Sequence, residues 1–283
     1  MGGKIVFGND GEPSGIGPSR ELDENPMPKE LMRYRLKDMP VYIETGPFLN
    51  TEEFYTRLVG KEDGLSVFSK GQQRLLMLFI GCIVDFFKVY EGSFVLAHPD
   101  FDIQNFIVSP DGDLVGIIDW NGVSVRPHSV GNLKYPGWLT RDLDPGMNGD
   151  GSDGVREDPY SRDDSPETLA AYRHIYAGII AEILAAEKQR MGLVSRREAD
   201  ANVTRATLLT ESISIAASSR MDRGNIIRKI VEKIGTVVEV PGNFDRQNLY
   251  MDLCNLAGED LLGPETEEAL KAEFKKLLGT HSL

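Results

Sequence analysis

Three polar side chains in the middle of the chain have the types and spacing needed for phosphoryl transfer to an alcohol. Asp100 is followed five positions later by Asn105, and Asp119 stands at the end of a later apolar run. In such a transfer one carboxylate orients and deprotonates the hydroxyl, while an amide and a second carboxylate hold magnesium against the phosphates. The three residues could supply these groups if the fold brings them together.

Short strands around a turn would position these side chains. Residues 106–108 and 114–118 are apolar and flank Ser109-Pro110-Asp111-Gly112, a sequence typical of a tight turn. Another apolar strand is predicted at 94–97, just before His98. The middle of the chain is therefore predicted to be strand, loop and hairpin, with the three polar groups converging on one cleft.

The residues of this segment resemble a known family motif. His98-Pro99-Asp100, the later Asn105 and the strand end at 117–120 are similar to the motif of aminoglycoside phosphotransferases and related small-molecule kinases. Residues 135–142 and 215–217 resemble segments common in fungal members. The resemblance therefore covers nearly the whole chain.

This resemblance implies a role for each motif residue. Asp100 would be the catalytic base, Asn105 and Asp119 the Mg²⁺ ligands, and His98 a structural prop for the loop. It also implies ATP as the phosphoryl donor and a small molecule bearing a hydroxyl or an amine as the acceptor. The acidic segment 142–166 could attract a cationic acceptor.

The beginning of the sequence departs from the family pattern. Kinases of this group have a preceding β-rich lobe with a phosphate-covering glycine loop and, after it, a strand lysine. Gly11, Gly15 and Gly17 lack that spacing, and Lys4 precedes them. Residues 4–18 instead predict a hairpin. We therefore expect the chain to start inside the large lobe and to be inactive alone, as a truncated gene model, a split gene or a degenerate paralogue.

The fold expected is α+β and mainly α-helical, namely the C-terminal lobe of a protein-kinase-like fold with a catalytic-loop β-hairpin and without the N-terminal β-rich lobe. We expect one such lobe over residues 1–283. It would comprise a hairpin and irregular segment (1–60), a helix with the catalytic loop and hairpin (70–141), a mobile acidic loop (142–166) and a helical subdomain (166–283).

Individual helices can be predicted from their start signals and apolar periodicity. Asn50 with Glu53 forms a capping box that opens a helix to about Val59, whereas residues 20–49 read as irregular. Further helices are expected at 70–90, over the apolar positions from Leu169 to Leu184, and near 203–218, 222–235, 246–257 and 264–278.

Composition excludes several classes of protein. The chain has 283 residues with 44 acidic and 31 basic side chains, a formal charge of −13, which argues against binding to nucleic acid or an anionic membrane. Cys82 and Cys254 are too few for a disulfide framework, and no secretory signal is seen at the N-terminus. The apolar run 75–87 is too short to span a membrane. These features predict a cytoplasmic protein.

Other interpretations of the motif remain open. The segment 98–100 could be only a tight turn, or the chain could be a non-catalytic, pseudokinase-like binding or regulatory protein. His98-Pro99-Asp100 is also the chaperone-stimulating tripeptide of J-domains, but apolar strands flank it here and the basic helix of J-domains is missing. The partners expected are a complementing N-terminal lobe or, through apolar surface left exposed without that lobe, further copies of the chain.

Neighbouring polar and aromatic residues have simpler predicted roles. Asp102 is expected to bond the loop backbone, and Trp120 and Trp138 to serve packing. His128 and His174 lack partners at metal-ligand spacing and are expected to be structural.

Overall fold

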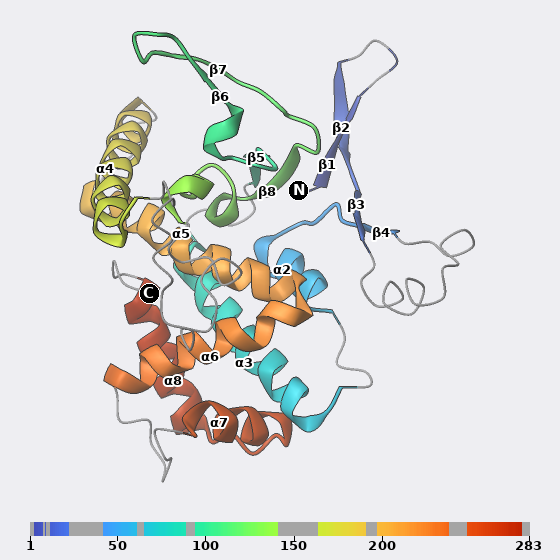
Figure 1. Cartoon of the computed structure of the whole chain (residues 1–283). Coiled ribbons are helices and arrows are strands. Elements are labelled where there is room, and N and C mark those ends of the chain that lie inside the picture. The colour runs from blue at the N-terminus through green and yellow to red at the C-terminus, as the bar shows by residue number, and fades with distance from the viewer. Residues whose placement is uncertain are drawn as a thin grey trace.

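The computed structural model describes most of the chain and shows a mainly α-helical protein with small antiparallel sheets (Figure 1). The described residues are 3–7, 9, 12–22, 42–60, 65–88, 94–140, 164–190, 197–237 and 248–278. Within them lie seven α-helices: α2 (Thr51–Val59), α3 (Val67–Phe86), α4 (Pro166–Arg190), α5 (Arg197–Ser218), α6 (Arg220–Val237), α7 (Leu249–Gly258) and α8 (Pro264–Leu278).

Helix α3 forms the centre of the helical body, which also contains α2, α5, α6, α7 and α8. Its side chains Leu75 and Ile83 are fully buried, and Phe79 stacks on Phe274 of α8 at 4.6 Å. Helix α7 approaches so closely that a Cβ on Gly71 would lie 1.6 Å from the carbonyl oxygen of Cys254. The expected buried helix is confirmed, and helices from the last third of the chain pack around it.

The helix starts follow their capping residues. Asn50 caps α2, since its Oδ1 accepts from the Glu53 backbone N–H at 2.8 Å, and the Glu53 carboxylate accepts from the Leu49 N–H at 2.8 Å. Ser66 caps α3 and accepts from the Ser69 N–H at 3.2 Å, so this helix begins and ends a few residues before the predicted 70–90. The four C-terminal helices lie close to their predicted ranges.

The largest sheet has the strand order β2-β1-β8-β5 and is antiparallel throughout. Its strands are β1 (Gly3–Phe7), β2 (Pro13–Gly17), β5 (Phe94–Ala97) and β8 (Ser124–Pro127). The β1–β2 hairpin and β5 were predicted and are confirmed. Strand β8 was not predicted, because it is short and ends in Arg126-Pro127. It is nevertheless central, since it pairs with both β1 and β5.

Two further antiparallel pairs complete the strands. The pair β6 (Phe106–Val108) and β7 (Leu114–Ile117) is the predicted hairpin, closed by bonds from Ser109 N to Asp113 O and from Gly112 N to Ser109 O. The pair β3 (Ser19–Leu22) and β4 (Tyr42–Thr45) corrects the expectation that residues 20–49 are irregular. Strands β3 and β4 are far apart in the chain, so their pairing leaves no local signal in the sequence.

Two helices have the length and composition of membrane spans. Among the described residues, α3 and α4 are long and apolar enough to cross a membrane by these two measures alone. The most apolar window of α3 is 44% buried, as in the core helix of a folded protein, whereas that of α4 is only 22% buried. The acidic segment predicted to be mobile lies outside the described residues except for 164–166.

Candidate functional site

His98 fixes the shape of the loop that follows β5. The ring is 7% exposed; its Nδ1 accepts a hydrogen bond from the Asp100 N–H at 3.2 Å, and its Nε2 lies 2.8 Å from the carbonyl oxygen of Ile118. Because Nδ1 accepts, the hydrogen is on Nε2, which donates to Ile118. One imidazole therefore ties the start of the loop to the end of β7.

The Asp100 carboxylate is held by two amides from the same loop. Asn105 Nδ2 donates to Asp100 Oδ2 at 3.0 Å and to the Asp100 carbonyl oxygen at 2.7 Å, and Gln104 Nε2 donates to Oδ2 at 2.8 Å. Asn105 is buried at the end of the short 3-10 helix Ile103–Asn105, while Asp100 is exposed. The loop thus presents a fixed carboxylate to solvent.

Asp119 stands beside this loop in a strained backbone conformation. The hydrogen bond from Ile118 N to Asn105 O, at 2.9 Å, extends the β6–β7 ladder and brings Asp119 to the same end of the hairpin as Asn105. Asp119 has φ of 59°, in the left-handed region that costs a non-glycine residue about 1 kcal/mol or more. Such strain persists where surrounding structure enforces it, often at functional sites.

A small aromatic cluster supports the loop. Phe101 packs against Phe106 at a centroid distance of 5.1 Å, and Phe106 packs edge-on against Trp138 at 5.0 Å. The Gly137 N–H donates to the Phe101 carbonyl oxygen at 2.9 Å, and a Cβ on Gly137 would lie 3.1 Å from Asp102 Oδ2. The segment after β8 therefore packs directly against the loop and holds it in place.

The residues next to the motif have mainly structural contacts. Asp102 Oδ1 accepts from the Ile103 N–H at 2.6 Å, which confirms its predicted bond to the loop backbone. Trp138 packs in a buried cluster with Tyr135, whose pKa is raised to about 12 by burial. Trp120 is half exposed and stands edge-on to His98 at 4.7 Å. A packing role therefore holds fully for Trp138 and in part for Trp120.

Gln104 was missed by the sequence reasoning. It lies four positions after Asp100, between the two motif residues, and its amide is one of the donors to the Asp100 carboxylate. The available signal was its place within the loop, because a side-chain amide there has a carboxylate within reach. Its contact shows that the loop fixes Asp100 with more than the motif residues alone.

The donor chemistry at the hairpin end suits a hard cation. An amide oxygen of Asn105 and a carboxylate of Asp119 are oxygen ligands of the kind that Mg²⁺ takes, usually with water and substrate phosphates completing its shell. Among the described residues, no group of three or more His, Cys, Asp or Glu side chains could hold a metal. A cation at this end would therefore depend on ligands that arrive with a substrate.

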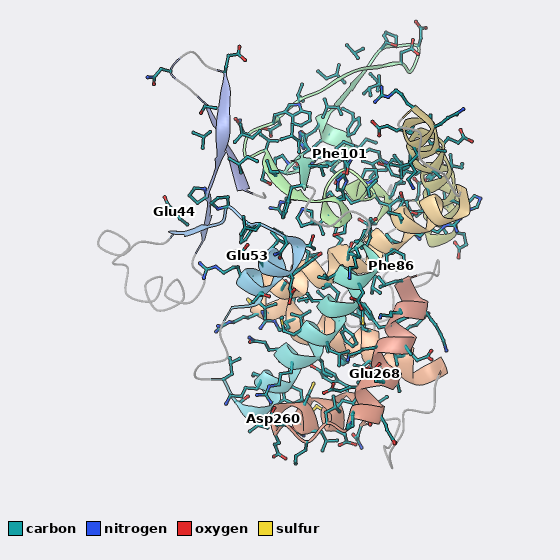
Figure 2. All side chains as sticks on the ribbon, turned by 180° about the vertical axis from the view of Figure 1, so that it is seen from behind. Glu44, Glu53, Phe86, Phe101, Asp260 and Glu268 are labelled. Atoms are coloured by element: carbon teal, nitrogen blue, oxygen red, sulfur yellow. The ribbon has the colours of Figure 1, made fainter. Side chains whose placement is uncertain are left out.

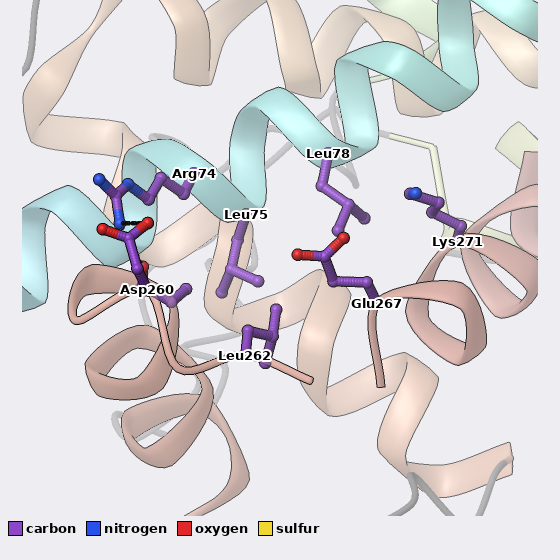
Figure 3. A pocket seen from close by; sticks show the side chains of 8 residues that line it. Arg74, Leu75, Leu78, Asp260, Leu262, Glu267 and Lys271 are labelled. Atoms are coloured by element: carbon purple, nitrogen blue, oxygen red, sulfur yellow. Dashed lines mark hydrogen bonds and ion pairs between the residues drawn. The ribbon is translucent and has the colours of Figure 1, made fainter. Parts of the chain in front are cut away.

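A cavity of about 250 Å³ lies elsewhere, where α3 meets α8 and the connection between α7 and α8 (Figure 3). Figure 2 shows Phe101 of the loop at the opposite end of the molecule from Asp260 and Glu268. Arg74 donates to the Ala257 carbonyl oxygen at the end of α7 and pairs with Asp260. These contacts hold the α7–α8 connection against α3. We therefore interpret the residues that line the cavity as structural.

Comparison of the chain with family models, with curated proteins and with solved structures found no match.

Proposed function

We propose that the protein is the catalytic-loop lobe of an aminoglycoside-phosphotransferase-like kinase, which acts in phosphoryl transfer from ATP to a small molecule. The observation that carries the proposal is the double role of Asn105. Its side chain bonds the Asp100 carboxylate, and its backbone carbonyl accepts from the residue before Asp119. A buried residue thus links the proposed base with the proposed metal-binding carboxylate.

The proposed chemistry assigns one task to each group. Both loop amides bond Asp100 Oδ2, which leaves Oδ1 to accept the proton of an acceptor hydroxyl. Asn105 and Asp119 would hold Mg²⁺, which neutralises charge on the ATP phosphates. His98 keeps the loop and the hairpin end in register, so that the three groups keep their relative positions.

The proposal includes a requirement for a second, nucleotide-covering lobe. Phosphoryl transfer depends mainly on positioning and charge neutralisation. Among the described residues before α3 there are two antiparallel strand pairs and α2, and Lys4 in β1 pairs with Gly17 and Ser124 of neighbouring strands. The β6–β7 hairpin leaves apolar side chains such as Val115 (67% exposed) in solvent, which supports docking of another lobe there.

The alternative is a non-catalytic binding or regulatory protein that keeps the loop geometry. Within residues 1–66 no lysine follows a glycine loop of the kinase spacing, and this alternative takes that as the state of the whole protein. In this case the protein would bind nucleotide or acceptor but would not transfer a phosphoryl group, with or without a second lobe. The two proposals therefore differ in activity and agree in predicting a ligand at the hairpin end.

Binding of nucleotide is the first test. We expect weak ATP binding that requires Mg²⁺ and that is lost in Asp119→Ala and in Asn105→Ala, measured by titration calorimetry. Asp111→Ala is the matched control, because it removes one carboxylate from the exposed turn at the far end of the same hairpin. Equal binding by the wild type and Asp119→Ala would contradict the assigned metal site.

Turnover is the second test, and it separates the two proposals. The chain should show no ATP-dependent phosphorylation of hydroxyl- or amine-bearing acceptors alone, and should gain it when a complementing nucleotide lobe is added. The gain should disappear in Asp100→Ala and persist in Asp111→Ala. If the chain alone shows turnover and Asp100→Ala abolishes it, no second lobe is needed. If the chain is inactive both alone and with the added lobe, the non-catalytic alternative is favoured.

A further inference from the structure

Arg173 is a buried arginine of α4 that bonds a backbone segment far from its own helix. It is 9% exposed, and its Nη1 donates to the carbonyl oxygen of Leu139 at 2.7 Å, thirty-four positions earlier in the chain. Leu139 is the last residue of the short 3-10 helix Gly137–Leu139, and the carbonyl groups at a helix end favour a nearby cation. Arg173 therefore fixes the end of this short helix against α4.

A second side chain of α4 holds the other end of the same segment. The Tyr176 hydroxyl donates to the carbonyl oxygen of Lys134 at 3.4 Å, and burial raises the pKa of Tyr176, so the hydroxyl keeps the proton that it donates. Because Arg173 and Tyr176 are three positions apart, they lie on the same side of the helix. Helix α4 thus contacts residues 134–139 at both ends.

The middle of this segment contacts the catalytic loop. The Gly137 N–H donates to the carbonyl oxygen of Phe101, the residue after Asp100, at 2.9 Å. The bonds of His98 and Asn105 fix the shape of the loop, but they join it only to itself and to the end of the hairpin. The Gly137 bond instead joins the loop to a segment that α4 holds, so it helps to place the loop relative to the helices.

We propose that Arg173 is a positioning residue for the catalytic loop of the proposed site. By holding the Leu139 carbonyl group, it keeps the Gly137 N–H on Phe101 and thereby keeps the Asp100 carboxylate in place. Arg173 acts through this backbone and not on a reacting atom. The consequence for nucleotide binding rests on the proposed function, whereas the positioning of the loop can be measured without a ligand.

Arg74 makes a comparable bond without any contact to the loop. It donates to the carbonyl oxygen of Ala257 near the end of α7 at 2.8 Å and pairs with Asp260, which lies at the opposite end of the molecule from Phe101 (Figure 2). Both arginines bond a carbonyl group near a helix end, but of the two it is Arg173 that bonds a segment in contact with the loop. Substitution of Arg74 therefore measures the loss of such a bond by itself.

Amide hydrogen exchange of the whole chain, followed by mass spectrometry, is the first test. Arg173→Met removes the donor but keeps a side chain of similar length, so the Leu139 carbonyl group loses a buried partner. Exchange at Gly137 and in the loop 100–105 should become at least about tenfold faster, while exchange in α3 stays unchanged, because the opening is local. Arg74→Met is the matched control and should leave exchange of the loop unchanged. Unchanged exchange of the loop in Arg173→Met would contradict the proposal.

Arg173→Lys tests whether the bond to Leu139 is the cause. Lysine keeps the positive charge and a donor, and the contact with Leu139 uses one nitrogen, so most of the protection of the loop should return. A lysine variant that exchanges as fast as Arg173→Met would argue against this bond. The proposal is also overturned if Arg173→Met does not fold, or if exchange in α3 rises as much as exchange in the loop, since either result assigns Arg173 to general stability.

Nucleotide binding connects the loop position with the proposed function. The loop carries Asn105, a proposed Mg²⁺ ligand, so Arg173→Met should weaken Mg²⁺-dependent ATP binding about tenfold in titration calorimetry, whereas Arg74→Met should not. If the wild type does not bind ATP, the proposed function fails, and the exchange results still decide the role of Arg173. If exchange of the loop becomes faster but the affinity for ATP stays the same, Arg173 does not position the ligand site and the proposal is overturned.

Discussion

The helical body and the β6–β7 hairpin differ in how far their apolar side chains are buried. In the body, Leu75 and Phe79 are fully buried and helices meet at backbone distance at Gly71. In the hairpin, Leu114 and Val115 point into solvent and the two strands pair only with each other. The body is therefore stabilised by its own packing, and the hairpin is shaped mainly by polar bonds around His98 and Asn105.

The difference indicates which region determines stability, and it separates that region from the residues of the proposed function. A substitution in the body acts on the free energy of unfolding, because tightly packed helices cannot relax around it. A substitution at the hairpin end acts on the positions of Asp100 and Asp119 while leaving the core intact. Four comparisons of variants follow, from the largest expected effect to the smallest.

Gly71→Ala should have the largest effect. The new Cβ would lie 1.6 Å from the Cys254 carbonyl oxygen, so α3 and α7 must move apart. We expect the free energy of unfolding to fall by about 4 kcal/mol or more, measured by urea denaturation. Gly81→Ala in the same helix is the control, since its Cβ meets nothing; it should raise stability by about 0.5–1 kcal/mol. Similar losses in both variants would contradict the close approach.

Leucine truncation compares the two regions directly. Leu75→Ala should lower the free energy of unfolding by about 3 kcal/mol, because it removes buried methyl groups and leaves a cavity. Leu114→Ala in the hairpin should change it by less than about 0.5 kcal/mol, because that side chain is mostly in solvent. A large loss in Leu114→Ala would mean that something already covers the hairpin.

Asp119→Gly tests whether the backbone at Asp119 is strained. Glycine adopts the left-handed conformation without the cost that Asp119 incurs at φ of 59°. The glycine variant should therefore be more stable than Asp119→Ala by about 1 kcal/mol, measured by thermal denaturation, while both lose metal-dependent nucleotide binding. If alanine and glycine are equally stable, the backbone at this position is not strained.

His128 directly follows β8, and its replacement should have the smallest effect on stability. Burial lowers its pKa from 6.5, although the hydrogen bond with Asn132 opposes this shift. The unfolded chain therefore takes up the proton first as pH falls, so stability is full above pH 6.5 and declines as pH drops below it. Urea denaturation at pH 7.5 and pH 5.5 should show this decline, and His128→Gln should reduce it. An unchanged pH dependence in the variant would assign the effect to other groups.

Some of the fold could be predicted because its signals are local. The Asn50 and Glu53 capping box, the turn at 109–112 and the apolar periodicity of α3 each describe contacts within a few residues. Strands β3, β4 and β8 could not be predicted in this way. Their pairing joins segments that are far apart in the chain, and residues such as Pro127 carry no strand preference of their own.

The site was predictable in composition and less so in geometry. The spacing of Asp100, Asn105 and Asp119 indicated a loop and a hairpin, and their roles stay predictions. The place of Gln104 within the loop was a signal for its bond to Asp100 that the sequence reasoning did not use, whereas no local pattern indicated that Asp119 takes a left-handed conformation. The hydrogen bond from Ile118 N to Asn105 O joins residues thirteen positions apart, so the geometry beside Asp119 is not a property of its sequence neighbours alone.

The contact between α3 and the C-terminal helices has a consequence for synthesis of the chain. Helix α3 leaves the ribosome early, but Cys254 and Phe274, which cover it, are made near the end. At about 5–20 residues per second, this long apolar helix waits roughly 10–40 s for these partners. During translation this helix is a natural substrate for chaperones, and a ribosome that stalls before α7 would release an aggregation-prone chain.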